Sequence, residues 1–239
     1  MRDNNNQALG LTSAQASALA IGQSLVLLLD DDDDLREGLS WLFESADLPL
    51  VSYGNFNDFE AEIQAHCASN KNLCLLLDLR MPDKSGLEVF QWLKKSGLSL
   101  DRLPVIFLTG HGDISTAVET VKNGAFDFYE KPATDQRLIE RVKQALTKSS
   151  EYLNQQQVLK KWAERIETLS PREREVMWLV AKGRLNKIIA SDLDISMRTV
   201  EVHRSNVFEK LKVRSAAELA ALLSQLSGLL GFDQLTGLE

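Results

Sequence analysis

Continuous apolar runs of about five residues recur along the first 130 positions of the chain. The two strongest, Leu25–Leu29 and Leu73–Leu77, are each followed directly by an aspartate. A run so short and so apolar predicts a strand buried on both faces, as in a parallel sheet. Weaker runs predict three more strands, so that the set is Leu25–Leu29, Leu50–Tyr53, Leu73–Asp78, Pro104–Leu108 and Phe126–Glu130.

Between these strands the apolar positions change to helical spacing. Leu35, Leu39, Leu42 and Phe43 follow this spacing after the first strand. Similar patterns predict helices over 56–69, around 87–93, over 114–121 and from about 135 onward. Strand and helix alternate five times, which predicts an α/β fold with a doubly wound, five-stranded parallel sheet.

Polar residues stand where four of the strands end: Asp30 and Asp31, Asp78, Thr109, and Lys131. The carboxyl ends of parallel strands meet at one edge of a sheet, where such folds bind their ligands. Asp33 and Asp34 suit the start of the following helix, and Asp78 alone fits either a helix cap or a functional site. Three converging carboxylates repel one another unless a cation neutralises them, and hard oxygen ligands favour Mg²⁺.

These residues also suit phosphoryl chemistry. The Asp78 carboxylate can act as a nucleophile toward a phosphoryl group. We expect Mg²⁺ to be held by Asp31 and Asp78, by Asp30 through water and by the Arg80 carbonyl group. Lys131 would supply positive charge to the phosphoryl oxygens, and the Thr109 hydroxyl would report whether the group is present. The bond from Lys131 to Pro132 is compatible with either isomer, and the cis form, which is the minority state of X-Pro bonds, would aim the lysine at the site.

The second half of the chain has a different charge and a different pattern. Residues 1–150 carry 14 basic and 22 acidic residues, a balance of −8, whereas residues 151–239 carry 13 and 12, a balance of +1. Ser170, Pro171 and Glu173 predict a capped helix start. A second helix over 186–193 is followed by a turn and by a third helix, Ser196–Leu211, and then by a fourth. This all-α pattern predicts a four-helix helix-turn-helix domain with a polyanionic partner.

The pattern divides the chain into five segments. Residues 1–23 are predicted to be a disordered extension and residues 227–239 a tail, and the two domains are predicted over 24–145 and 168–226. The segment between them, 146–167, has neither proline nor glycine and predicts a helical linker. This helix either pairs with its copy in a dimer or packs on its own domain. The extension is not a secretion signal, no segment predicts a membrane span, and Cys67 and Cys74 suit reduced thiols in the cytoplasm.

Residues 24–145 resemble the receiver domain of bacterial two-component response regulators, most closely those of the FixJ type. The resemblance rests on four motifs: Asp30-Asp31, Asp78–Gly86, Thr109–Asp113 and Phe128–Pro132. It implies that Asp78 is the phosphoacceptor, Asp30 and Asp31 the acidic pair, and Lys131 the phosphate-pairing lysine. Thr109 and Phe128 match the switch residues. Lys84 departs from the family pattern, which often has an apolar residue there.

Residues 168–226 resemble the LuxR/NarL-type DNA-binding domain. The resemblance rests on 169–176, 186–190 and 196–204, and it implies that the third helix is the recognition helix. Base edges would be met by Glu201, Val202 and Ser205, although a solvated Glu201 is equally compatible with the pattern. Phosphates would be met by Lys187, Arg198, His203, Arg204 and Asn206.

Together the resemblances imply a cytoplasmic transcription regulator, not an enzyme, whose partners are a sensor histidine kinase, double-stranded promoter DNA and RNA polymerase. Phosphorylation would favour a homodimer through a face that includes Ile114, Val118, Lys122 and Asp127. One alternative is a Mg²⁺-dependent phosphohydrolase with an aspartyl-phosphate intermediate. Such enzymes need a second carboxylate two residues after the nucleophile, where this chain has Arg80. A regulator that acts without phosphorylation is the other alternative.

Overall fold

The computed structural model describes residues 23–110, 120–132 and 136–230. The chain divides into two compact units, Met1–Asn154 and Gln155–Glu239, and each is described by itself. None of the helices in these described ranges combines the length and the apolar composition that crossing a membrane requires.

The first unit contains a parallel sheet of five strands in the order β2-β1-β3-β4-β5. The strands are β1 (Ser24–Leu29), β2 (Leu50–Tyr53), β3 (Asn72–Asp78), β4 (Val105–Thr109) and β5 (Asp127–Glu130). The predicted α/β fold is therefore confirmed, and each strand begins and ends within one residue of its predicted position. β1, β3 and β4 are buried along their whole length, because helices cover both faces of the sheet.

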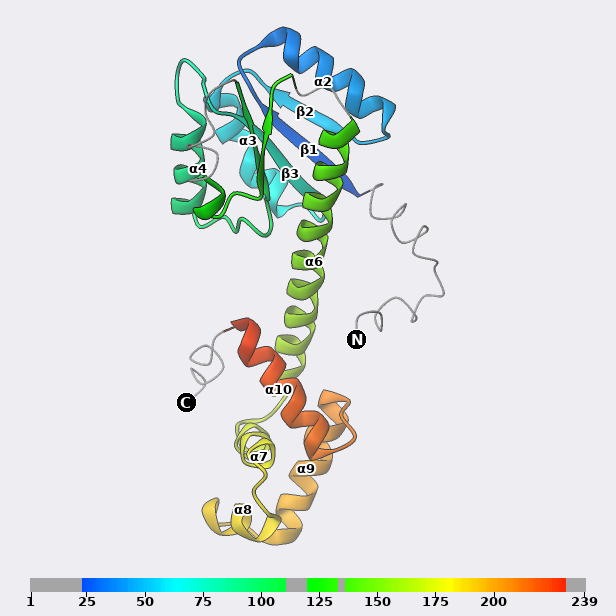
Figure 1. Ribbon diagram of the computed structural model, residues 1–239. Helices are drawn as coiled ribbons and strands as arrows, with labels where there is room; N and C mark the ends of the chain where they lie inside the picture. Colours follow the sequence, from blue (N-terminus) through cyan, green and yellow to red (C-terminus); the bar gives the residue numbers. More distant parts are fainter. Residues whose placement is uncertain (1–22, 111–119, 133–135, 231–239) are drawn as a thin grey trace. The chain divides into compact units, whose positions relative to one another are not determined.

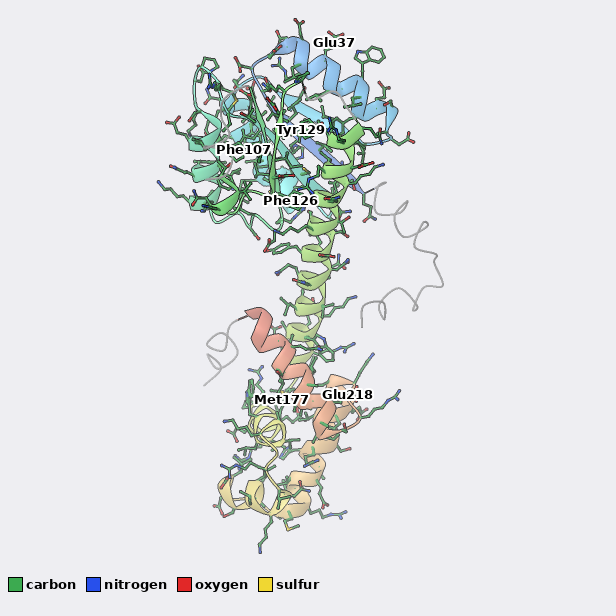
Figure 2. All side chains as sticks on the ribbon, in the orientation of Figure 1. Glu37, Phe107, Phe126, Tyr129, Met177 and Glu218 are labelled. Carbon is green, nitrogen blue, oxygen red and sulfur yellow. The ribbon has the colours of Figure 1, made fainter. Side chains whose placement is uncertain are left out.

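Alternate strand residues contribute to two apolar cores, one on each face. On one face α3 (Phe56–Ala68) and α4 (Gly86–Lys95) pack on a core that includes Leu77 and Phe107. On the other, α2 (Asp33–Ser45) and the first part of α6 (Gln136–Glu167) pack on Leu28 and its neighbours. Figure 1 shows these helices on opposite sides of the sheet, and Figure 2 labels the fully buried Phe107 between strands and helices.

Local sequence explains where these helices begin. Asp32 is the N-cap of α2 and accepts a hydrogen bond from the Leu35 amide, so Asp33 and Asp34 lie in the first turn as predicted. α4 begins with a capping box between Ser85 and Glu88, which was not among the predicted helix starts. The helix predicted on Ile114, Val118 and Val121 falls mostly in 111–119, outside the described residues.

The second unit consists of the end of α6 and the helices α7 (Pro171–Ala181), α8 (Asn186–Asp192), α9 (Met197–Leu211) and α10 (Ala216–Leu230). The predicted capping box of α7 is present, and Ser196 is the N-cap of α9. Val176, Met177 and Val207 lie in the core of this unit, and Figure 2 labels Met177 there. Helix α10 continues to Leu230, so residues 227–230 of the segment predicted to be a tail are helical.

Candidate functional site

The carboxyl edge of the sheet brings together the residues that the strand-end pattern selected. Asp30 follows β1, Asp78 is the last residue of β3, Thr109 is the last residue of β4 and Lys131 follows β5. β1, β3, β4 and β5 are neighbours in the sheet. Four residues spread over 100 positions of the chain therefore share one edge of the fold.

Three carboxylates converge at this edge. Asp30, Asp31 and Asp78 each offer an oxygen, and these oxygens lie within 4.8 Å of one another. Asp30 and Asp78 are buried, whereas Asp31 is exposed to solvent. Burial raises the pKa of Asp30, and this effect outweighs the hydrogen bonds from Lys131 and the Asp32 amide.

Lys131 bridges the two buried carboxylates. Its ammonium nitrogen lies 2.8 Å from Asp30 Oδ2 and 2.6 Å from Asp78 Oδ1. Burial by itself would lower the pKa of Lys131, but hydrogen bonds to the two carboxylates outweigh burial and the pKa is raised. The lysine therefore stays charged and compensates the two buried acids. The bond between Lys131 and Pro132 is cis.

The donor set fits Mg²⁺. It offers hard oxygens only, and the exposed Asp31 leaves one side open to solvent. The Arg80 amide donates to Asp78 Oδ2 over 2.8 Å, so the backbone of Arg80 lies beside the site. Asp30, Asp31 and Asp78 are the described residues that could hold the ion.

The loop after Asp78 closes tightly on the backbone of this aspartate. The Gly86 amide donates to the Leu79 carbonyl over 3.1 Å. A Cβ at position 86 would lie 2.1 Å from the Asp78 carbonyl oxygen, which is sterically impossible without a backbone shift. Gly86 is part of the Asp78–Gly86 motif, but no local sequence pattern reveals its close approach to the Asp78 backbone.

The two residues predicted to act as switches lie on neighbouring strands, Thr109 at the end of β4 and Phe128 within β5. Thr109 is buried, and its hydroxyl donates to the Gly110 carbonyl over 3.0 Å. Phe128 is half-buried and packs on the core beneath α3 and α4. Of the residues predicted for a dimer face, Ile114 and Val118 fall outside the described residues. Lys122 is exposed, and Asp127 forms an ion pair with Arg141 of the same chain.

The predicted DNA-contacting residues fall into two groups. The exposed group comprises Lys187 on α8 and Arg198, Glu201, Val202 and Ser205 on α9. The half-buried group comprises His203, Arg204 and Asn206. Arg204 donates to the Asn186 side chain over 2.9 Å and lies over the Phe208 ring, and Asn206 bonds to Glu173. These two residues therefore help to hold α9 against α7 and α8.

Two family models match the chain. The response regulator receiver domain matches residues 26–143, and the luxR family of bacterial regulatory proteins matches residues 167–223. The response regulator protein TodT of Pseudomonas putida is 37% identical over 203 residues, 85% of this chain and 86% of TodT. The transcriptional regulatory protein FixJ of Azorhizobium caulinodans is 40% identical over 211 residues, 88% of this chain and 96% of FixJ.

Solved structures agree with these matches. The response regulator StyR is 34% identical with a TM-score of 0.72, over 85% of this chain and 99% of that structure. Full-length FixJ from B. japonicum is 34% identical with a TM-score of 0.51, over 87% of this chain and 99% of that structure.

A receiver-type sheet with an acidic site, followed by a LuxR-type helical unit, defines a two-component response regulator. The chain belongs to the family of such regulators that includes FixJ and TodT. The resemblance stated from the sequence motifs is thereby confirmed.

Proposed function

We propose that a sensor histidine kinase phosphorylates Asp78, and that the phosphorylated protein dimerises, binds specific promoter DNA and activates transcription. The observation that carries this proposal is the convergence of Asp30, Asp31, Asp78 and Lys131 at one edge of the sheet. We place the receiver domain at 24–145, the linker at 146–167 and the DNA-binding domain at 168–226, and we propose that the protein acts in the cytoplasm.

In the chemical step an Asp78 oxygen attacks the phosphorus of a phosphohistidine. The new O–P bond forms as the P–N bond breaks, and the imidazole nitrogen leaves with the electron pair of that bond. A bound Mg²⁺ would neutralise charge on the phosphoryl oxygens. Lys131 already lies 2.6 Å from Asp78 Oδ1 and can pair with the new phosphoryl oxygens without a long movement.

The phosphoryl group offers the Thr109 hydroxyl a charged acceptor in place of the Gly110 carbonyl. A turn of Thr109 toward the site leaves space that Phe128 can enter from its half-buried position. This coupled movement would shift the population toward the state that dimerises through the face of Ile114, Val118, Lys122 and Asp127. For Asp127 this requires exchange of its ion pair with Arg141.

At the DNA, the exposed Glu201, Val202 and Ser205 are suited to base edges. Lys187 and Arg198, which are also exposed, are suited to contacts with phosphates. His203, Arg204 and Asn206, which are half-buried on α9, would add to these phosphate contacts. RNA polymerase would be the further partner at the promoter.

Intact-mass spectrometry after incubation with acetyl phosphate and Mg²⁺ tests the site. We expect the wild type to gain one phosphoryl group and Asp78→Asn to gain none. Asp83→Asn is the matched control, because Asp83 is an exposed carboxylate in the same loop, and it should label like the wild type. Equal labelling of Asp78→Asn would contradict the proposal.

Two assays separate the alternatives. We propose that the chain does not turn over phosphate esters, because the exposed Arg80 stands where a phosphohydrolase needs its second carboxylate. Rapid multiple turnover of small phosphate esters would contradict this. DNA binding that is identical with and without phosphorylation would instead favour the phosphorylation-independent regulator.

A further inference from the structure

We propose that Arg36 is a positioning residue for the magnesium ligands, because it holds the carbonyl group of Asp30 and thereby orients Asp31. This inference rests on the magnesium site of the proposed function. It adds a residue outside the acidic set, from the first turn of α2.

Arg36 contacts the backbone of the acidic pair directly. Its Nη1 donates to the Asp30 carbonyl oxygen over 2.7 Å, and its other terminal nitrogen pairs with the Asp33 carboxylate. Its side chain is only 19% exposed, so the guanidinium is partly shielded from water. A hydrogen bond from a charged donor to a carbonyl group is among the stronger ones in proteins.

The position of this bond explains its effect. The Asp30 amide donates to the Tyr53 carbonyl over 3.1 Å, which fixes the peptide group before Asp30. The Asp30 carbonyl belongs to the next peptide plane, which leads to Asp31. Arg36 fixes the rotation of that plane, and so determines where the exposed Asp31 side chain projects.

Gly54, which follows β2, leaves the space that the guanidinium occupies. A Cβ at Gly54 would lie 3.1 Å from both terminal nitrogens of Arg36 and 3.2 Å from Cζ. Gly54 is not among the described glycines with a positive φ, so alanine is compatible with its backbone. Gly54→Ala therefore requires the guanidinium of Arg36 to shift by a few tenths of an ångström while the arginine is kept.

The charge of Arg36 and its positioning role predict opposite effects of its removal on the affinity for Mg²⁺. A guanidinium close to the site repels a divalent cation, so by charge alone its removal would tighten binding. If Arg36 positions the ligands, its removal weakens binding, and loss of a residue that orients metal ligands typically costs about 10- to 100-fold in affinity. The direction of the change decides between the two.

Titration calorimetry of Mg²⁺ into the unphosphorylated full chain measures this change. We expect Arg36→Met to bind about 10- to 100-fold more weakly. Arg36→Lys, which keeps the charge but has no planar fork, should recover only part of the loss. Gly54→Ala should also weaken binding, and should have no further effect when added to Arg36→Met. Glu37→Gln is the neighbouring control on the outer side of α2, where Figure 2 labels Glu37, and it should bind nearly as the wild type does.

Unchanged or tighter binding by Arg36→Met would overturn the inference, as would a Gly54→Ala effect that persists without Arg36. If Arg36→Met does not fold, as judged by circular dichroism, Arg36→Lys decides instead: wild-type or tighter Mg²⁺ binding by Arg36→Lys would then count against the inference. Failure of the wild type to bind Mg²⁺ would instead contradict the magnesium site of the proposed function.

Discussion

At the scale of single residues, the site depends on how Lys131 balances two buried acids. Asp30 and Asp78 are nearly inaccessible to solvent, and each lies within 2.8 Å of the same ammonium nitrogen. A buried charge without compensation is strongly destabilising. The lysine therefore stabilises the folded protein, and the same position lets it pair with a phosphoryl group on Asp78.

The close approach of Gly86 to the Asp78 backbone predicts that alanine destabilises the protein at position 86, whereas alanine at Gly38 stabilises it. Gly86→Ala should lower the free energy of unfolding by about 2–3 kcal/mol, because the added Cβ meets the Asp78 carbonyl oxygen. Gly38→Ala, in the interior of α2, adds a Cβ with no heavy atom within 4 Å and should stabilise by about 0.5–1 kcal/mol.

Denaturant unfolding of the two variants measures both effects, and acetyl phosphate labelling measures the consequence at the site. Gly86→Ala should label more slowly than the wild type and Gly38→Ala at the wild-type rate. A Gly86→Ala protein as stable as the wild type would show that the loop does not need this close approach.

At the scale of elements, one carboxylate joins two helices of the DNA-binding unit. Glu173 accepts from the Ser170 amide over 2.8 Å within the capping box of α7. It also pairs with Lys210 of α9 over 2.6 Å and bonds to Asn206. Burial would raise the pKa of Glu173, but these hydrogen bonds outweigh it and lower the pKa to about 2.

This lowered pKa predicts how stability depends on pH. A carboxyl group whose pKa is lower in the folded state stabilises the fold above its unfolded pKa of about 4.3, and this contribution is lost as the pH falls toward 2. Glu173→Gln should therefore cost about 1–3 kcal/mol at pH 7, and the difference from the wild type should disappear between about pH 4.3 and 2.

Unfolding curves of both proteins from pH 7 to pH 2.5 check this prediction. Glu175→Gln serves as the control, because Glu175 pairs with Arg172 at the surface and such pairs contribute about 0–1 kcal/mol. A Glu173→Gln difference that stays constant over the whole range would refute the role assigned to the charge.

At the scale of the whole molecule, charge is divided between the two halves of the chain. Residues 1–150 have a balance of −8 and residues 151–239 a balance of +1. Only the second half is suited to a polyanion, and its exposed basic residues include Lys187 and Arg198. Phosphate contacts release counterions from DNA, so each one adds to the salt dependence of binding.

Binding of the phosphorylated protein to promoter DNA should therefore weaken steeply with salt. Arg198→Ala should weaken binding to all sequences alike and reduce the slope of log K against log salt concentration by about 1 per protomer. Val202→Ala, on the same helix, should leave the slope unchanged and alter the preference among sequences. Fluorescence anisotropy over a range of salt concentrations, with several DNA sequences, measures the slope and the sequence preference. An unchanged slope for Arg198→Ala would show that Arg198 does not contact a phosphate.

The apolar runs predicted the sheet well because a strand covered on both faces must be apolar along its length, a property visible in β1 and β3 without any partner. Their carboxyl ends then identified Asp30 and Asp78. The helix start at Ser170 was predicted equally well, because a capping box depends on two residues that are three positions apart in the sequence. The helical residues at 227–230 were not predicted, because Ser227 and Gly228 have low helix propensity, a weak preference that tertiary context can override.

The sequence by itself thus determined the fold class, the family and the four strand-end positions of the site, because each depends on local periodicity or on a motif of adjacent residues. Only the tertiary structure decided which groups touch: Lys131 against two acids, Gly86 against the Asp78 backbone, Arg36 against the Asp30 carbonyl and Glu173 against Lys210. Most of these contacts join different elements, and all depend on distances of a few ångströms that packing sets and that no spacing along the chain encodes.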